Sequence, residues 1–206
     1  MLYKTVNKYL ERRDLMPPKK KYSRKQIVET AFKLAKDNGL ESLTARKVAD
    51  ELGSSVAPIY VSFDDIKDLK KAVAQKAFNI SREMSKEEVT GDKFLDIGIA
   101  SLRFAKQYSK LFQELVLKKN DYMEDYDQEL GDGIIEEMSE NLKLSDLTEE
   151  ELRMILLKMR IFQLGLSVMV ANDLLPEDFD EEAQIDLLES MGTDVINSTR
   201  IKGEEK

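Results

Sequence analysis

Residues 43–63 read LTARKVADELGSSVAPIYVSF and contain two short helical patterns on either side of a glycine. In the first pattern Val48, Ala49 and Leu52 recur at helical spacing, and Ala49 is small enough to let a second helix cross closely. Gly53 suits the turn that ends such a helix. Two short helices joined by a glycine turn are typical of a helix-turn-helix, whose second helix can enter the major groove of DNA.

The second pattern predicts a short helix over about residues 55–63. Ser55 is a suitable N-cap, and Pro58 falls in the first turn, where no backbone N–H is needed. Ile59 and Phe63 are four residues apart, so we expect both to point into the core. The opposite, outward face is then formed by Val56, Ala57, Pro58, Tyr60 and Ser62.

Two further helices flank this motif. Ser23 and Gln26 form a capping box at the start of the first, and Gly39 predicts a left-handed stop at its end. The second begins near Asp64 or Asp65 and continues towards Met84. Before them, Leu2, Val6, Tyr9 and Leu10 predict an extra N-terminal helix of unknown role, followed by a basic arm.

The rest of the chain is also helical in pattern. We expect helices at about 92–108, 109–119, 122–142, 148–173 and 180–199. The fold class is therefore all-α, and the fourth predicted head helix should join head and body. The expected division is an extension and arm (1–22), a helix-turn-helix domain (23–86) and a helical effector-binding and dimerisation domain (87–206).

Composition narrows the function. The 206 residues contain no cysteine and no histidine, which removes thiolate chemistry, the commonest general base and the commonest metal ligand. We therefore expect no enzyme, cofactor or metal. No apolar run near the N-terminus indicates a signal peptide, so a cytoplasmic location is expected.

Charge is divided unevenly along the chain. Residues 1–86 hold 19 Lys and Arg against 11 Asp and Glu, net +8, and the remaining 13 basic and 29 acidic residues give net -16. A basic head on an acidic body favours a head that binds nucleic acid.

The run from residue 43 resembles the N-terminal domain of the TetR family of bacterial repressors. The positions that match its pattern are Leu43, Thr44, Arg46, Val48, Ala49, Leu52, Gly53, Ser55, Ile59, Tyr60, Phe63 and Leu69. Two positions depart from it. Ser54 replaces the usual valine, and Ile66 replaces a lysine that resembles a phosphate anchor in the family, with Lys67 one position later.

The resemblance implies a DNA-binding surface. Thr44 and Arg46 would contact phosphates, Arg46 could also reach a base, and Tyr60 would hydrogen-bond a phosphate unless it packs against the first helix. Apolar side chains on the second helix can offer contacts to thymine methyls. The arm would follow the minor groove or phosphates, or form a solvated linker. The DNA-binding candidates are Lys19, Lys20, Lys21, Tyr22, Arg24, Thr44, Arg46, Ser54, Ser55, Val56, Ala57, Pro58, Tyr60, Ser62 and Lys67.

For the body, the resemblance implies a small-molecule effector pocket and a homodimer through the last two long helices. The candidate pocket residues, each of which could equally be core, are Phe104, Phe112, Met123, Tyr126, Met138, Met159 and Phe162. Glu136, Glu137 and Asp127 could favour a cationic ligand or form a solvated face. The expected function is a ligand-responsive repressor on a pseudo-palindromic operator. The alternative is a protein–protein adaptor of the same fold that has lost sequence-specific DNA binding.

Overall fold

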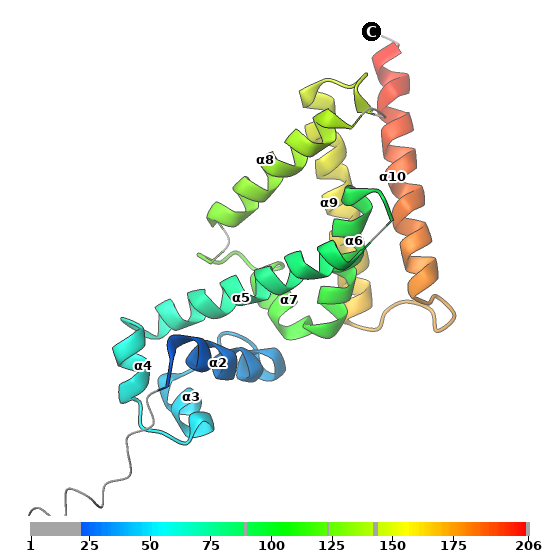
Figure 1. The fold of residues 1–206 in the computed structure, drawn as a ribbon. Coiled ribbons are helices and arrows are strands. Elements are labelled where there is room, and N and C mark those ends of the chain that lie inside the picture. The colour runs from blue at the N-terminus through cyan, green and yellow to red at the C-terminus, as the bar shows by residue number, and fades with distance from the viewer. Residues whose placement is uncertain (1–21, 89, 123, 142–143, 205–206) are drawn as a thin grey trace, which may run out of the picture.

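The structure, a computed structural model, describes residues 22–88, 90–122, 124–141 and 144–204. Within these residues every regular element is helical (Figure 1). The extra N-terminal helix expected near residues 2–10 lies outside the described residues. The head contains α2 (Arg24–Asn38), α3 (Ala45–Leu52), α4 (Ala57–Ser62) and the first part of α5 (Ile66–Glu87).

Five more helices lie in the part of the body that the structure describes. α5 leads from the head into α6 (Lys93–Gln107), which is followed by α7 (Ser109–Leu115) and α8 (Glu124–Glu140). The two longest helices come last, α9 (Glu149–Ala171) and α10 (Glu181–Glu204). They pack along each other on the side of the body away from the head (Figure 1). The all-α fold with an N-terminal helix-turn-helix is thereby confirmed.

Local signals place most helix ends correctly. Ser23 and Gln26 form the predicted capping box, and Thr148 and Glu151 form another at the start of α9. The Oγ1 atom of Thr44 accepts a hydrogen bond from the Lys47 backbone N–H at 3.2 Å, which caps α3. These caps satisfy N–H groups that have no partner within the helix, so the sequence itself determines where the helices begin.

Two predicted ends are wrong in detail. Ser55 does not cap α4, because the N-cap position is Val56, which makes no side-chain capping bond. Gly39 has φ 84° and ψ 156°, so it turns the chain into an extended conformation instead of the left-handed helical one. Packing also favours glycine at this position, because a Cβ atom there would lie 2.7 Å from a carboxylate oxygen of Glu114 in α7.

Gly53 does adopt the left-handed conformation, with φ 64° and ψ 38°, and an added Cβ would meet no neighbour within 4 Å. Gly53→Ala therefore tests backbone strain without a steric clash. We expect it to lower the free energy of unfolding by about 1 kcal/mol, because L-residues other than asparagine and aspartate resist this conformation. Urea unfolding followed by circular dichroism measures this. Gly53→Asn should lower the free energy of unfolding by less than Gly53→Ala does. Equal decreases for both variants would argue against backbone strain as the cause.

The main hydrophobic core joins head and body. It contains buried residues of α2 to α5, such as Ile27, Val48 and Leu69, together with Leu111 and Leu115 of α7. Phe104, Ala105 and Phe112 of α6 and α7 belong to the same cluster. The core thus crosses the domain boundary expected at residue 86, through α7 packed on α2 as well as through α5.

A second core lies wholly within the body. It is built from one face of α9, represented by Leu152, Ile155 and Met159, with residues of α6, α8 and α10 packed around it. α9 packs on α6, α8 and α10. α10 continues to Glu204, beyond the predicted end near residue 199.

α7 is shorter than expected and ends at Leu115. The side-chain amide of Asn120 donates hydrogen bonds to the backbone carbonyls of Glu114, Leu115 and Lys118, at 3.2, 3.0 and 2.8 Å. One side chain therefore satisfies carbonyls that a longer helix would have satisfied. The segment after α7 is folded back as a compact turn.

Candidate nucleic-acid interface

α4 presents a mostly apolar outer face. Ile59 and Phe63 are buried as predicted, and they anchor α4 to the head core. Tyr60 is 55% exposed, so more than half of its surface is accessible to solvent. Val56 and Ala57 are exposed beside it, which leaves the hydroxyl of Tyr60 as the main polar group of this face.

Val61 is a surface residue that sequence reasoning missed. It is 86% exposed, more than any other large apolar side chain among the described residues. The signal was available, because Val61 lies four residues after Ala57 and therefore on the same side of the helix. An aliphatic side chain there can contact thymine methyl groups in the major groove.

The other candidates around the helix-turn-helix differ in how they are placed. Arg46 is exposed, and Thr44 keeps its side chain at the surface while capping α3. The hydroxyl of Ser54 donates to the Ser55 carbonyl at 2.9 Å, which stabilises the turn before α4. Ser55 is exposed, whereas Pro58 and Ser62 are half-buried.

Two candidates at the end of the basic arm help to build the head. The hydroxyl of Tyr22 donates a 2.6 Å hydrogen bond to the Leu52 carbonyl, which links the arm to the end of α3. The guanidinium of Arg24 lies 4.5 Å from the centre of the Phe63 ring and 4.0 Å from an Asp68 oxygen. Both contacts support a positioning role. Lys19, Lys20 and Lys21 lie outside the described residues.

The start of α5 is more acidic than a phosphate-binding helix end would favour. Ile66, at the position of the family's lysine, is partly buried against the main core, and Lys67 is exposed. Asp65 caps the helix by accepting from the Asp68 N–H at 2.8 Å, and a carboxylate oxygen of Asp68 accepts from the Asp64 N–H at 3.4 Å. These carboxylates repel a phosphate, so a contact from Lys67 stays a prediction.

The predicted pocket residues do not come together. Phe104 and Phe112 are buried in the core shared by head and body, whereas Met138, Met159 and Phe162 belong to the second core. Glu136 is exposed on α8. Met123 lies outside the described residues, as do the side chains of Tyr126, Asp127 and Glu137. The five described side chains of this set are divided between the two cores, because long helices distribute their apolar faces over more than one neighbour. That any of them lines a ligand pocket stays a prediction.

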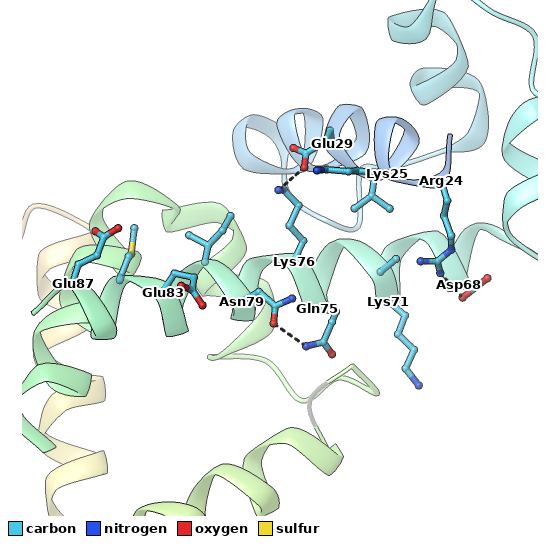
Figure 2. A pocket seen from close by; sticks show the side chains of 14 residues that line it. Arg24, Lys25, Glu29, Asp68, Lys71, Gln75, Lys76, Asn79, Glu83 and Glu87 are labelled. Atoms are coloured by element: carbon cyan, nitrogen blue, oxygen red, sulfur yellow. Dashed lines mark hydrogen bonds and ion pairs between the residues drawn. The ribbon is translucent and has the colours of Figure 1, made fainter. Parts of the chain in front are cut away.

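An open groove of about 860 Å³ does lie between α2 and α5 (Figure 2). The apolar residues that line it include Val28, Ala72 and Met84. Its rim carries charges of both signs, and Lys76 pairs with Glu29 across it at 2.8 Å. Its mixed rim gives the groove no preference for an anion or a cation. Within the described residues, no three acidic, histidine or cysteine side chains gather as metal ligands would.

α9 leaves an apolar stripe uncovered. Met154, Leu157 and Ile161 follow one another at helical spacing and are all exposed, Ile161 by 64%. By length and composition this helix could also cross a membrane, but core helices of soluble proteins meet the same criteria. Leu187 and Ile201 on the neighbouring α10 are exposed as well. Exposed apolar residues that lie in a row on packed helices are typical of a protein–protein interface.

In this fold α4, the second helix of the helix-turn-helix, is exposed on the head, and the head is attached to a helical body that ends in two long helices. This arrangement is that of helix-turn-helix proteins of the DNA-binding regulator class. The comparisons agree. Residues 27–73 match the family described as bacterial regulatory proteins, tetR family. The protein thus carries the TetR-family helix-turn-helix domain within the fold of TetR-family transcriptional regulators.

Solved structures share this fold over most of the chain. A tetR-family transcriptional regulator from Streptomyces coelicolor has a TM-score of 0.66 at 14% identity, over 88% of this chain and 83% of that chain. A putative transcriptional regulator from Pseudomonas aeruginosa PAO1 has a TM-score of 0.60 at 16% identity, over 91% of this chain and 96% of that chain. The fatty acid degradation regulator FadR from Bacillus halodurans has a TM-score of 0.55 at 14% identity, over 88% of this chain and 96% of that chain. None of the curated protein sequences compared with the chain matches it.

Proposed function

We propose that this protein is a cytoplasmic, homodimeric, ligand-responsive repressor that binds a pseudo-palindromic operator. The exposed face of α4 is the observation that supports DNA binding. Tyr60 and Val61 are exposed on this face, whereas Ile59 and the C-cap residue Phe63 are buried in the core. A rigidly anchored helix with a free outer face can enter a major groove. Arg46 adds an exposed positive charge at the start of the motif.

The dimer is supported by the uncovered stripe on α9. A second copy that pairs α9 and α10 with their counterparts would bury Leu157 and Ile161 and form a four-helix interface. In such a dimer the two recognition helices would lie about 34–36 Å apart, which is one turn of DNA. A small molecule that prefers another separation of the heads would then lower operator affinity.

The exposed face of the recognition helix is suited to recognising DNA mainly by its shape and by contacts to thymine methyl groups. Tyr60 is its main exposed polar group, so few hydrogen bonds to base edges are available. We expect the operator to contain thymine-rich half-sites and the affinity to depend strongly on phosphate contacts. The same apolar face also favours the adaptor alternative, in which a partner protein covers Val56, Tyr60 and Val61.

Selection from a pool of random DNA duplexes distinguishes these functions. The purified full chain is incubated with the pool at about 50 and 200 mM salt, and bound duplexes are sequenced. An enriched inverted repeat whose binding weakens steeply with salt is the expected result. Salt-sensitive binding without an enriched sequence would mean that the head binds DNA only through its positive charge, without sequence preference. No binding at either salt concentration would favour the adaptor alternative.

A further inference from the structure

The loop between α2 and α3 is held by a side chain from the body. A carboxylate oxygen of Glu114, in α7, accepts hydrogen bonds from the backbone N–H groups of Leu40 and Glu41, the latter at 3.2 Å. Hydrogen bonds from N–H groups to a carboxylate are roughly twice as strong as neutral ones. Gly39, with φ 84° and no Cβ, allows the carboxylate to approach this closely.

The same loop has a second set of bonds on its other side. The Nζ atom of Lys70 in α5 lies 2.6 Å from a carboxylate oxygen of Glu41, and the Lys70 side chain is only 10% exposed. Tyr122, from the turn after α7, lies close enough to Glu41 for its hydroxyl to feel that carboxylate. Burial and the nearby carboxylates of Glu41, Asp121 and Glu114 raise the pKa of the Tyr122 hydroxyl above its usual value, so it remains a donor at neutral pH.

These contacts matter because residues 39–41 lie just before α3, the first helix of the helix-turn-helix. A head attached to the body through α5 alone could rotate about that helix. A second attachment, away from the α5 axis, removes that freedom. The buried contact between α2 and α7 is one such attachment, and the hydrogen bonds from the N–H groups of Leu40 and Glu41 to Glu114 extend it to the loop that precedes α3.

We propose that Glu114 is a positioning residue that fixes the orientation of the helix-turn-helix relative to the body, and thereby the spacing of half-sites that the dimer accepts. This inference rests on the proposed function. Glu114 itself touches no DNA. Its effect is on the discrimination between operators of different spacing, because a head that can rotate reaches half-sites that a fixed head cannot.

The test compares the operator obtained by selection with versions whose half-sites are one base pair closer and one base pair further apart. Glu114→Ala removes the acceptor, and Glu114→Gln keeps an acceptor oxygen without the charge. Glu29→Ala is the matched control, because it removes a carboxylate that pairs with Lys76 inside the head and leaves the body contact intact (Figure 2). Affinities are measured for all three operators, with thermal unfolding of each variant.

We expect the wild type and Glu29→Ala to prefer the native spacing equally. Glu114→Ala should reduce that preference by about fivefold or more, which is the lower end of usual coupling between sites, and Glu114→Gln should restore part of it. Unchanged spacing preference in a folded Glu114→Ala variant would overturn the inference. Should that variant not fold, Glu114→Asp, which keeps the charge but is one methylene shorter, takes its place with the same expected and contrary results.

A failure of the proposed function can be distinguished from a failure of the Glu114 inference. If the wild type enriches no inverted repeat in the selection, the repressor proposal fails and the spacing inference fails with it. If the wild type binds an inverted repeat with a clear spacing preference and Glu114 variants keep that preference, only the role of Glu114 is wrong.

Discussion

Ile161→Glu is expected to convert the dimer into monomers and to remove most operator affinity. Ile161 is the last and, at 64%, the most exposed of the three residues that form the α9 stripe. In the proposed dimer its side chain would be covered by the second copy. A carboxylate buried there without a partner is costly, and the two-fold symmetry would place two of them near each other.

The dimer dissociation constant should rise by about 100-fold or more, because unpaired buried charges at an interface cost several kcal/mol. Sedimentation velocity measures the change, and operator binding is measured at the same protein concentrations. Leu117→Glu is the control, since it places the same charge on an exposed leucine after α7, outside the exposed stripe of α9. An Ile161→Glu protein that stays dimeric would show that the copies meet through another surface.

The second large effect is expected from the double variant Arg46→Ala, Tyr60→Ala. Both side chains are exposed and have no structural role in the core, so the head should fold normally. If these side chains bind phosphates in both protomers of the proposed dimer, their removal should lower operator affinity by about 100-fold or more at low salt, since hydrogen bonds to charged groups contribute about 1.5–3 kcal/mol each.

The salt dependence identifies the cause of the weaker binding. Removing an arginine that binds a phosphate should reduce the slope of log affinity against log salt by about one for each phosphate that is no longer neutralised. Lys106→Ala is the control, because it removes an exposed positive charge from α6 in the body. A weaker affinity with an unchanged slope would mean that Arg46 and Tyr60 read bases or shape and leave the phosphates to other residues.

The sequence allowed the helices to be predicted because their signals are local. Ser23, Thr44 and Thr148 each cap a helix through a residue three positions away, and Gly53 ends α3 by its own conformation. The outward position of Tyr60 followed from the burial of Ile59 and Phe63 at helical spacing. The family pattern then indicated the kind of surface that these residues form.

What could not be predicted depends on contacts between distant residues. Leu40 and Glu114 are 74 positions apart, and nothing near either one indicates that a carboxylate meets that backbone N–H. Tyr22 was expected in the arm, yet its hydroxyl bonds to the Leu52 carbonyl, 30 positions away. Helical periodicity likewise shows that Phe112 and Met159 are buried, but not that they are buried in different cores.

The core shared by α2 to α7 has a consequence for exchanging parts between such proteins. A chimera that joins this head to a foreign body at residue 86 would leave Leu111, Phe112 and Leu115 behind and expose the apolar surface of α2 that they cover. It would also lack the carboxylate that holds the loop at Leu40. The transferable unit therefore ends after the turn that Asn120 closes, and a recipient body has to be joined there.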